Sequence, residues 1–162
     1  NKGISCYNIS MPVLADNKRA HFDYEILETF EAGLVLVGHE VKSVKAGRAS
    51  IPGAHVIIRG NEAYIVGMHI PPWQEANMPT GYEADRTRKV LLTKNEIKCL
   101  TGKTAQKGLT IVPLGVYTKH GLVKLRLGLG HGKKKTDKRQ IIKARESKRS
   151  IDRKMFFVQF IN

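Results

Sequence analysis

Apolar and other residues alternate without a break from Val123 to Leu129. A period of two is typical of a β-strand with one buried face, because successive side chains point to opposite sides of a sheet. We therefore expect the apolar side chains of this run to point into a core, and Lys124 and Arg126 to point away from it. The inward-pointing residues are predicted to be Val123, Leu125, Leu127 and Leu129.

Further short apolar runs, separated by turn residues, predict an antiparallel sheet around this strand. Residues 109–117 are the expected hairpin partner, with a turn at residues 119–121. A second hairpin is expected to turn at Gly60-Asn61, a pair that tolerates positive φ. Several short strands of this kind favour a small barrel, so the chain is predicted to be mainly β. The other expected strands are residues 24–30, 56–58, 63–66 and 88–92.

Two helices are expected between the strands. Thr93 and Glu96 form a capping-box pattern at the start of one helix, and Gly102 is its expected stop. The other helix is predicted over residues 38–46. Residues 71–82 contain prolines and show no periodicity, which indicates a loop.

Positive charge is concentrated towards the C-terminal end of the chain. The 162 residues carry a net charge of +14, and residues 131–154 hold eleven Lys or Arg against three Asp or Glu, a net +8. A segment this charged and this poor in apolar residues cannot offset the entropy lost on ordering. We therefore predict an N-terminal extension (1–15), a barrel (16–130) and a basic tail (131–162) that is disordered when free.

The excess of cations indicates a polyanionic partner. A membrane is disfavoured as that partner, because no apolar run approaches the roughly 18–20 residues of a membrane span. The first dozen residues lack the continuous apolar core of a signal peptide, so an intracellular location is expected. The two cysteines lie far apart without metal-ligand spacing, and neither a metal nor a cofactor is predicted.

The glycine-rich stretch from Gly128 to Lys134 does not match a nucleotide-binding P-loop. That motif needs Gly, four residues and then Gly-Lys-Ser/Thr, whereas Leu127 and Lys134 occupy the first glycine and hydroxyl positions here. Two interpretations stay open: a strand end with a hinge, or bare backbone that an RNA phosphate approaches closely. No histidine lies at a recognisable catalytic spacing from Ser, Cys or paired carboxylates, so no catalytic residues and no enzyme activity are predicted.

Basic residues of the predicted barrel fall in clusters, and we expect at least two clusters to contact phosphates. Glu31 has two open interpretations: a solvated turn carboxylate, or an acceptor for amino groups of RNA bases. Because aromatic residues make up only 7% of the chain, recognition by shape and backbone is favoured over reading of bases. The expected contacts are Lys18, Arg19 and His21; Lys42, Lys45 and Arg48; Arg86, Arg88 and Lys89; and Lys124.

Several separated motifs together resemble the small protein B (SmpB) family, over roughly residues 17–154. Four of them are Asn17-Lys18-Arg19-Ala20, Glu31-Ala32-Gly33-x-x-Leu36-x-Gly38-x-Glu40-Val41-Lys42-Ser43, Arg86-x-Arg88-Lys89-x-Leu91-Leu92 and Gly132-Lys133-Lys134-x-x-Asp137-Lys138-Arg139. Three places depart from the usual pattern, and at one of them Pro52-Gly53-Ala54-His55 replaces the usual Asp-Ser-Tyr after the first helix. Phe22 stands where His is usual, and Thr136 stands where a stacking His or Tyr is usual.

The resemblance implies a non-catalytic RNA-binding protein with an OB-like barrel, in the cytoplasm of a bacterium or in an organelle. Such proteins bind the tRNA-like domain of transfer-messenger RNA (tmRNA) and bring it to stalled ribosomes for trans-translation. The implied ribosomal partners are the decoding region and the mRNA channel, where the tail becomes helical; elongation factor Tu is an indirect partner through aminoacylated tmRNA. The matching RNA-face positions are Asn17, Arg19, Glu31 and Leu91, and the tail positions are Gly132, Lys133, Lys134, Asp137, Lys138 and Arg139.

Two other classes of protein fit part of the sequence. A generic ribosomal or translation-factor barrel would share the charge, but it would not need both the Glu31-Ala32-Gly33 block and the tail motif. An RNA-modifying enzyme would need a cofactor pocket or an activated nucleophile, and neither pattern is present in the sequence.

Overall fold

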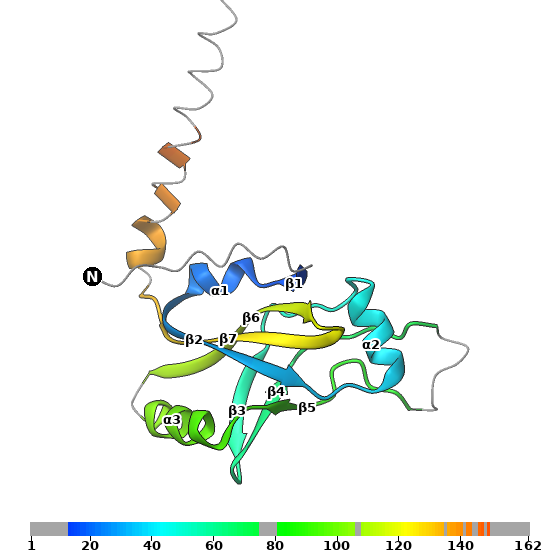
Figure 1. The fold of residues 1–162 in the computed structure, drawn as a ribbon. Coiled ribbons are helices and arrows are strands. Elements are labelled where there is room, and N and C mark those ends of the chain that lie inside the picture. Colours follow the sequence, from blue (N-terminus) through cyan, green and yellow to red (C-terminus); the bar gives the residue numbers. More distant parts are fainter. Residues whose placement is uncertain are drawn as a thin grey trace, which may run out of the picture.

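The computed structural model describes residues 13–74, 81–105, 108–134, 136–140, 142–143, 146–147 and 149. Within this part, seven antiparallel strands form one sheet that curls into a barrel-like ring (Figure 1). The strand order is β1-β6-β3-β4-β5-β2-β7; pairing of β6 with β7 closes strands β2 to β7 into the ring, and β1 is added along β6. The prediction of a mainly β barrel is confirmed. The strands are β1 (Val13–Asp16), β2 (Tyr24–Leu34), β3 (His55–Arg59), β4 (Glu62–Val66), β5 (Arg88–Leu91), β6 (Leu109–Lys119) and β7 (Leu122–Gly132).

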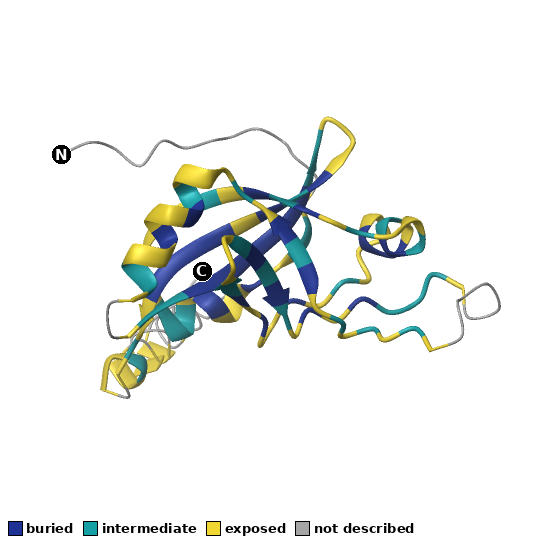
Figure 2. Cartoon of the chain, turned by 90° about the horizontal axis from the view of Figure 1, so that it is seen from below, coloured by how far each residue is buried: buried dark blue, intermediate teal, exposed yellow. Residues whose placement is uncertain are grey.

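The predicted register of β7 is also confirmed. All four apolar side chains of the alternating run are buried, whereas Lys124 is half-buried and Arg126 is exposed. In Figure 2 the buried residues follow the strands of the barrel, and the helices are exposed on their outer sides. Burial of each leucine side chain stabilises the fold by about 1.5–3 kcal/mol. The face of β7 that carries the leucines is therefore the one that packs on the core.

Both predicted hairpins are present. The β6–β7 hairpin turns at His120 and Gly121, with φ of 51° and 76°, and the β3–β4 hairpin turns at Gly60 and Asn61, with φ of 54° and 66°. Two successive residues with positive φ match the twist of the flanking strands, as in a type I′ turn. The turns therefore set the pairing that places the side chains described below.

Ahead of the tail, the described part of the chain has three helices beside the strands: α1 (Lys18–Asp23), α2 (Gly38–Lys45) and α3 (Lys94–Thr104). The predicted capping box of α3 is formed, since Thr93 Oγ1 accepts from Glu96 N–H (3.3 Å) and Glu96 Oε2 accepts from Thr93 N–H (2.8 Å). The prediction that Gly102 stops this helix is wrong. A helical glycine costs only about 1 kcal/mol, and the next turn still closes with a bond from Ala105 N–H to Thr101 O (3.2 Å).

Two short elements near the N-terminal end were not predicted. β1 pairs with β6, and α1 is capped by Asn17, whose side chain accepts from Ala20 N–H (3.1 Å) and donates to Pro113 O (2.8 Å). Four and six residues are too few to show a period, so these elements depend on long-range contacts.

The segment predicted as the tail begins within β7, and its described residues 136–140 are helical. The expectation that the tail is disordered when free stays a prediction. None of the described helices is long and apolar enough to cross a membrane.

Candidate nucleic-acid interface

Glu31 lies at the centre of a cationic cluster on the outer face of β2, β6 and β7. In the register of the sheet, Glu31 is opposite Arg126, and Lys124 is opposite Tyr117. Glu31 Oε2 accepts a hydrogen bond from the Tyr117 hydroxyl (2.6 Å) and lies 3.1 Å from Lys119 Nζ. Lys124 Nζ lies 3.8 Å from the other carboxylate oxygen. We refer to these five residues as the Glu31 cluster.

The electrostatics of the cluster fix its side chains in place. The hydrogen bond from Tyr117, with the charges of Lys119 and Lys124, lowers the pKa of the Glu31 carboxyl below its usual value. Burial and the bond to Glu31 raise the pKa of the Tyr117 hydroxyl. The Arg126 guanidinium lies 5.5 Å from the centre of the Tyr117 ring, a cation–π contact. Glu31 therefore contacts two lysines directly and Arg126 only through Tyr117, a role that neither sequence-based interpretation of Glu31 included.

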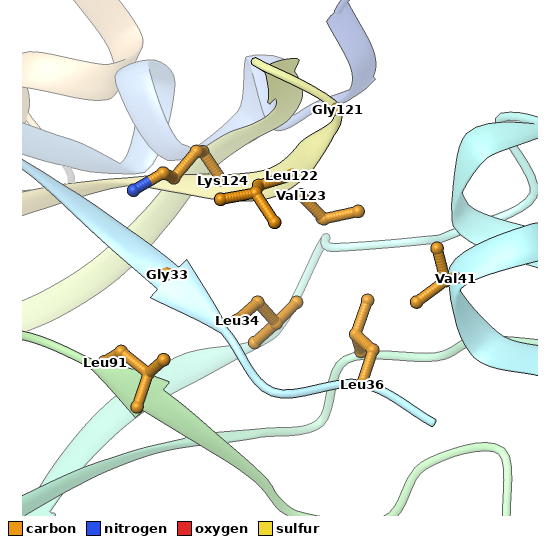
Figure 3. Close-up of a pocket in the computed structure, with 9 residues that line it drawn as sticks. All are labelled: Gly33, Leu34, Leu36, Val41, Leu91, Gly121, Leu122, Val123 and Lys124. Atoms are coloured by element: carbon orange, nitrogen blue, oxygen red, sulfur yellow. The ribbon is translucent and has the colours of Figure 1, made fainter. Parts of the chain in front are cut away.

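An apolar hollow lies beside this cluster (Figure 3). The hollow has a volume of about 300 Å³ and is lined by residues from the end of β2, from α2 and from the β6–β7 turn, with Lys124 at its edge. Leu91 also lines the hollow and is 52% exposed. A Cβ on Gly33 would lie 3.2 Å from the Leu91 Cβ, so the absence of a side chain at Gly33 lets Leu91 pack against the strand. The hollow suits a ligand that has an apolar surface and, beside it, a negative charge that can pair with Lys124.

In the predicted cluster at residues 86–89, the charge of Arg88 faces the interior of the barrel. Arg88 is only 1% exposed, and its guanidinium donates to Glu40 Oε1 (3.0 Å), Met68 O (2.6 Å) and Ala84 O (2.8 Å). The prediction that Arg88 contacts RNA is therefore wrong: sequence shows its charge but not its burial. Arg86 donates to the same carboxylate (2.8 and 2.5 Å).

Glu40 is the anionic centre of this internal network. Burial alone would raise the pKa of its carboxyl, but hydrogen bonds from Arg86, Val37 N–H and Arg88 lower that pKa to about 2. The network joins α2 to β5, which gives it a structural role. Lys89, on the outer side of β5, is paired with Glu62.

The predicted basic residues of α2 are exposed at the far side of the hollow. Lys42 and Lys45 lie on α2, and Arg48 follows it. The Arg48 guanidinium lies 4.8 Å from the centre of the Trp73 ring and donates to Trp73 O (3.4 Å). This stacking holds the loop after residue 70 against α2.

A second cationic surface combines α1 with the start of the tail. Lys18, Arg19 and His21 are exposed on α1, whereas Asn17 is buried by its role as the cap. In the first turn of the tail helix, Asp137 Oδ2 accepts from Lys134 N–H (3.2 Å), the contact that an acidic side chain three residues into a helix makes with the N-cap backbone. Among the positions of the tail motif, Lys133 and Lys138 are half-buried. The exposed ones are Gly132, Lys134 and Arg139.

These two surfaces lie at opposite ends of one strand pair. The β2–β7 ladder carries α1 and the tail at its Tyr24–Gly132 end, and Glu31 and Lys124 towards its other end. Lys124 and Gly132 are eight residues apart on β7, which is roughly 26 Å in a strand. A ligand that meets both surfaces must be an extended one.

Sequence reasoning missed Tyr117, Lys119 and Asp23 as members of these surfaces. Arg126 was expected to point outward but was not assigned to the site; its two-residue spacing from Lys124 was the available signal. Among the described residues, no group of three or more His, Cys, Asp or Glu side chains is placed to hold a metal ion.

Comparison with known proteins identifies the family. The family model described as "SmpB protein" matches residues 14–156. The chain belongs to the SmpB family. An SsrA-binding protein of Thermosynechococcus vestitus is 49% identical to it, over 90% of this chain and 96% of the relative. One of Acaryochloris marina is 46% identical, over 89% and 94%.

The SmpB fold is also matched among solved structures. A structure described as "tmRNA-SmpB: a journey to the center of the bacterial ribosome" is 45% identical, with a TM-score of 0.63. The match covers 76% of this chain and 86% of that one. The family resemblance inferred from the motifs is confirmed, and the departures at Phe22 and Thr136 occur within an SmpB sequence.

Proposed function

We propose that this SmpB-family protein binds the tRNA-like domain of tmRNA and brings it to stalled ribosomes for trans-translation. The observation that carries the proposal is the family match over residues 14–156, which includes both the barrel and the tail motif. Relatives named SsrA-binding proteins, and a neighbouring structure that pairs SmpB with tmRNA and the ribosome, support it. The protein acts by binding, without a catalytic step, and works in the cytoplasm.

The RNA face in this proposal is the Glu31 cluster with the adjoining hollow, extended by α1. Lys119, Lys124 and Arg126 supply cations for phosphates, and Leu91 supplies apolar contact. Lys18, Arg19 and His21 extend the surface along the β2–β7 ladder. Lys42, Lys45 and Arg48 continue it on α2, with Lys89 near its margin. Asn17 and Arg86 act indirectly, by holding α1 and α2 in place.

The tail has a separate role in the proposal. A stalled ribosome without downstream mRNA leaves a channel lined by RNA phosphates, and a cationic helix fits that space and charge. The tail motif from Gly132 to Arg139 begins this helix, with Asp137 in its first turn accepting from Lys134 N–H. Elongation factor Tu then meets the protein only indirectly, through aminoacylated tmRNA.

Titration of a labelled tRNA-like-domain RNA at several salt concentrations tests the RNA-binding step. Each neutralised phosphate contributes about −0.7 to −0.9 to the slope of log K against log salt, so about five contacts predict a slope of roughly −3.5 to −4.5. Lys42→Ala should flatten the slope by about one contact. An unrelated RNA hairpin is the control. Binding that is insensitive to salt, or equally tight for the hairpin, would contradict the proposal and favour a generic RNA-binding barrel.

A further inference from the structure

The geometry of the barrel brings the start of the tail against α1. α1 ends at Asp23 and leads directly into β2, and β2 pairs with the end of β7 at Tyr24 and Gly132. Lys133 extends this pairing, because its N–H donates to Asp23 O (2.9 Å) and its ammonium donates to His21 O (2.9 Å). The tail therefore leaves the barrel beside the C-terminal end of α1 (Figure 1).

A single carboxylate then joins α1 to the first turn of the tail helix. Asp23 Oδ1 lies 2.7 Å from Lys138 Nζ, and Asp23 Oδ2 lies 3.1 Å from Arg19 Nε. The Asp23 side chain is 24% exposed, so these charges are partly shielded from water. The Lys138 ammonium also lies 6.0 Å from the centre of the ring of Phe22, a residue that departs from the usual family pattern.

We infer that Asp23 is a positioning residue that anchors the start of the tail to α1, and that RNA bound at α1 strengthens this anchor. The second part rests on the proposed function. Asp23 is an anion on a surface where Arg19, 77% exposed, is placed to meet phosphates. Lys138 neutralises that anion, so a docked tail removes a repulsion that phosphates would otherwise meet. Because coupling between two binding events is reciprocal, bound RNA also favours the docked tail.

Hydrogen exchange of the amides of residues 136–140 tests the anchor in the full-length protein without RNA. Asp23→Asn should speed exchange about two- to fivefold, the range of a partly exposed ion pair. Glu28→Gln is the matched control, since Glu28 pairs with Lys103 on α3, away from the tail. Exchanging the charges, Asp23→Lys with Lys138→Asp, should restore the slow rate. Unchanged exchange in Asp23→Asn would overturn the anchor; Lys138→Ala gives the same test should Asp23→Asn unfold the barrel.

RNA affinity tests the coupling. Lys138→Ala should weaken binding of the tRNA-like-domain RNA about two- to fivefold in the natural sequence, and should have little effect when Asp23→Asn is also present. An equal loss in both backgrounds would mean that Lys138 meets RNA directly, and would overturn the coupling. Since the exchange experiment contains no RNA, failure of the proposed function and failure of the anchor give different results.

Discussion

At the scale of single residues, the structure explains the spaced glycines near the end of β7. A Cβ on Gly130 would lie 2.2 Å from the Glu25 carbonyl oxygen, and one on Gly128 would lie 3.1 Å from side-chain atoms of Ile26 and Leu114. Both glycines are buried between β7 and its neighbours. The strand-end interpretation of the motif therefore holds for Gly128 and Gly130, and close approach of a phosphate to these two positions is excluded.

Gly130→Ala is expected to destabilise the barrel by about 1–3 kcal/mol, because the new methyl group would overlap the backbone of β2. Thermal unfolding followed by circular dichroism measures the effect. Gly132→Ala is the matched control, since no heavy atom lies within 4 Å of a Cβ built there. Equal melting temperatures for the two variants would show that the strands adjust without cost.

Glu31→Ala is expected to weaken binding of the tRNA-like-domain RNA several-fold, although it makes the surface more positive. The reason is that Lys119 and Lys124 lose the carboxylate that holds them in position. Glu28→Ala is the control, because Glu28 likewise pairs with a lysine, Lys103, which lies on α3 outside the proposed RNA face. Fluorescence titration measures both variants. Tighter binding by Glu31→Ala would mean that charge alone governs this surface.

At the scale of elements, the sequence predicted the strands, turns and helices that are determined by residues close together in the chain. The β6–β7 hairpin, the β3–β4 hairpin and the start of α3 follow from alternation, turn residues and a capping box. β1 and α1 could not be predicted in this way, because their stability comes from pairing with β6 and from the bond between Asn17 and Pro113. Residues of the candidate site that depend on long-range contacts could not be predicted for the same reason.

Charge in the sequence does not distinguish an exposed arginine from a buried one. Arg88 looked like Arg19 in the sequence, but it lies inside, paired with Glu40. The Glu31 cluster was only partly predictable, since Tyr117 and Glu31 are 86 residues apart and meet through the pairing of both strands with β7.

The ion pairs that join α2 to β5 predict a pH dependence of stability. The pKa of Glu40 is about 2 in the folded protein, below its ordinary value of 4.5. A lowered carboxyl pKa stabilises the fold above pH 4.5, and this contribution, about 3 kcal/mol, is lost as the pH falls from 4.5 towards 2. Urea unfolding of the natural protein and of Glu40→Gln between pH 7 and pH 2.5 measures the difference. The variant should be less stable at pH 7, and the gap should narrow below pH 4.5. A gap independent of pH would contradict the assignment.

At the scale of the whole molecule, the closed ring and the tail are built for different contacts. The ring presents the Glu31 cluster on its outer face, whereas the tail starts at the opposite end of the β2–β7 ladder, and its described helical residues extend away from the barrel (Figure 1). The tail segment from residue 131 to 154 also carries more than half of the net charge. In the proposed function, the barrel binds tmRNA and the tail acts on the ribosome.

A protein that ends at Gly132 tests this division most directly, because the whole of β7 is kept and the charged segment is removed. Its affinity for the tRNA-like-domain RNA and its support of peptide tagging on stalled ribosomes are measured together, beside the full-length chain. We predict affinity within a few-fold of the full-length protein and no tagging. Tagging at the full-length rate by the shortened protein would contradict the role of the tail, and loss of RNA affinity by more than tenfold would contradict the role of the barrel.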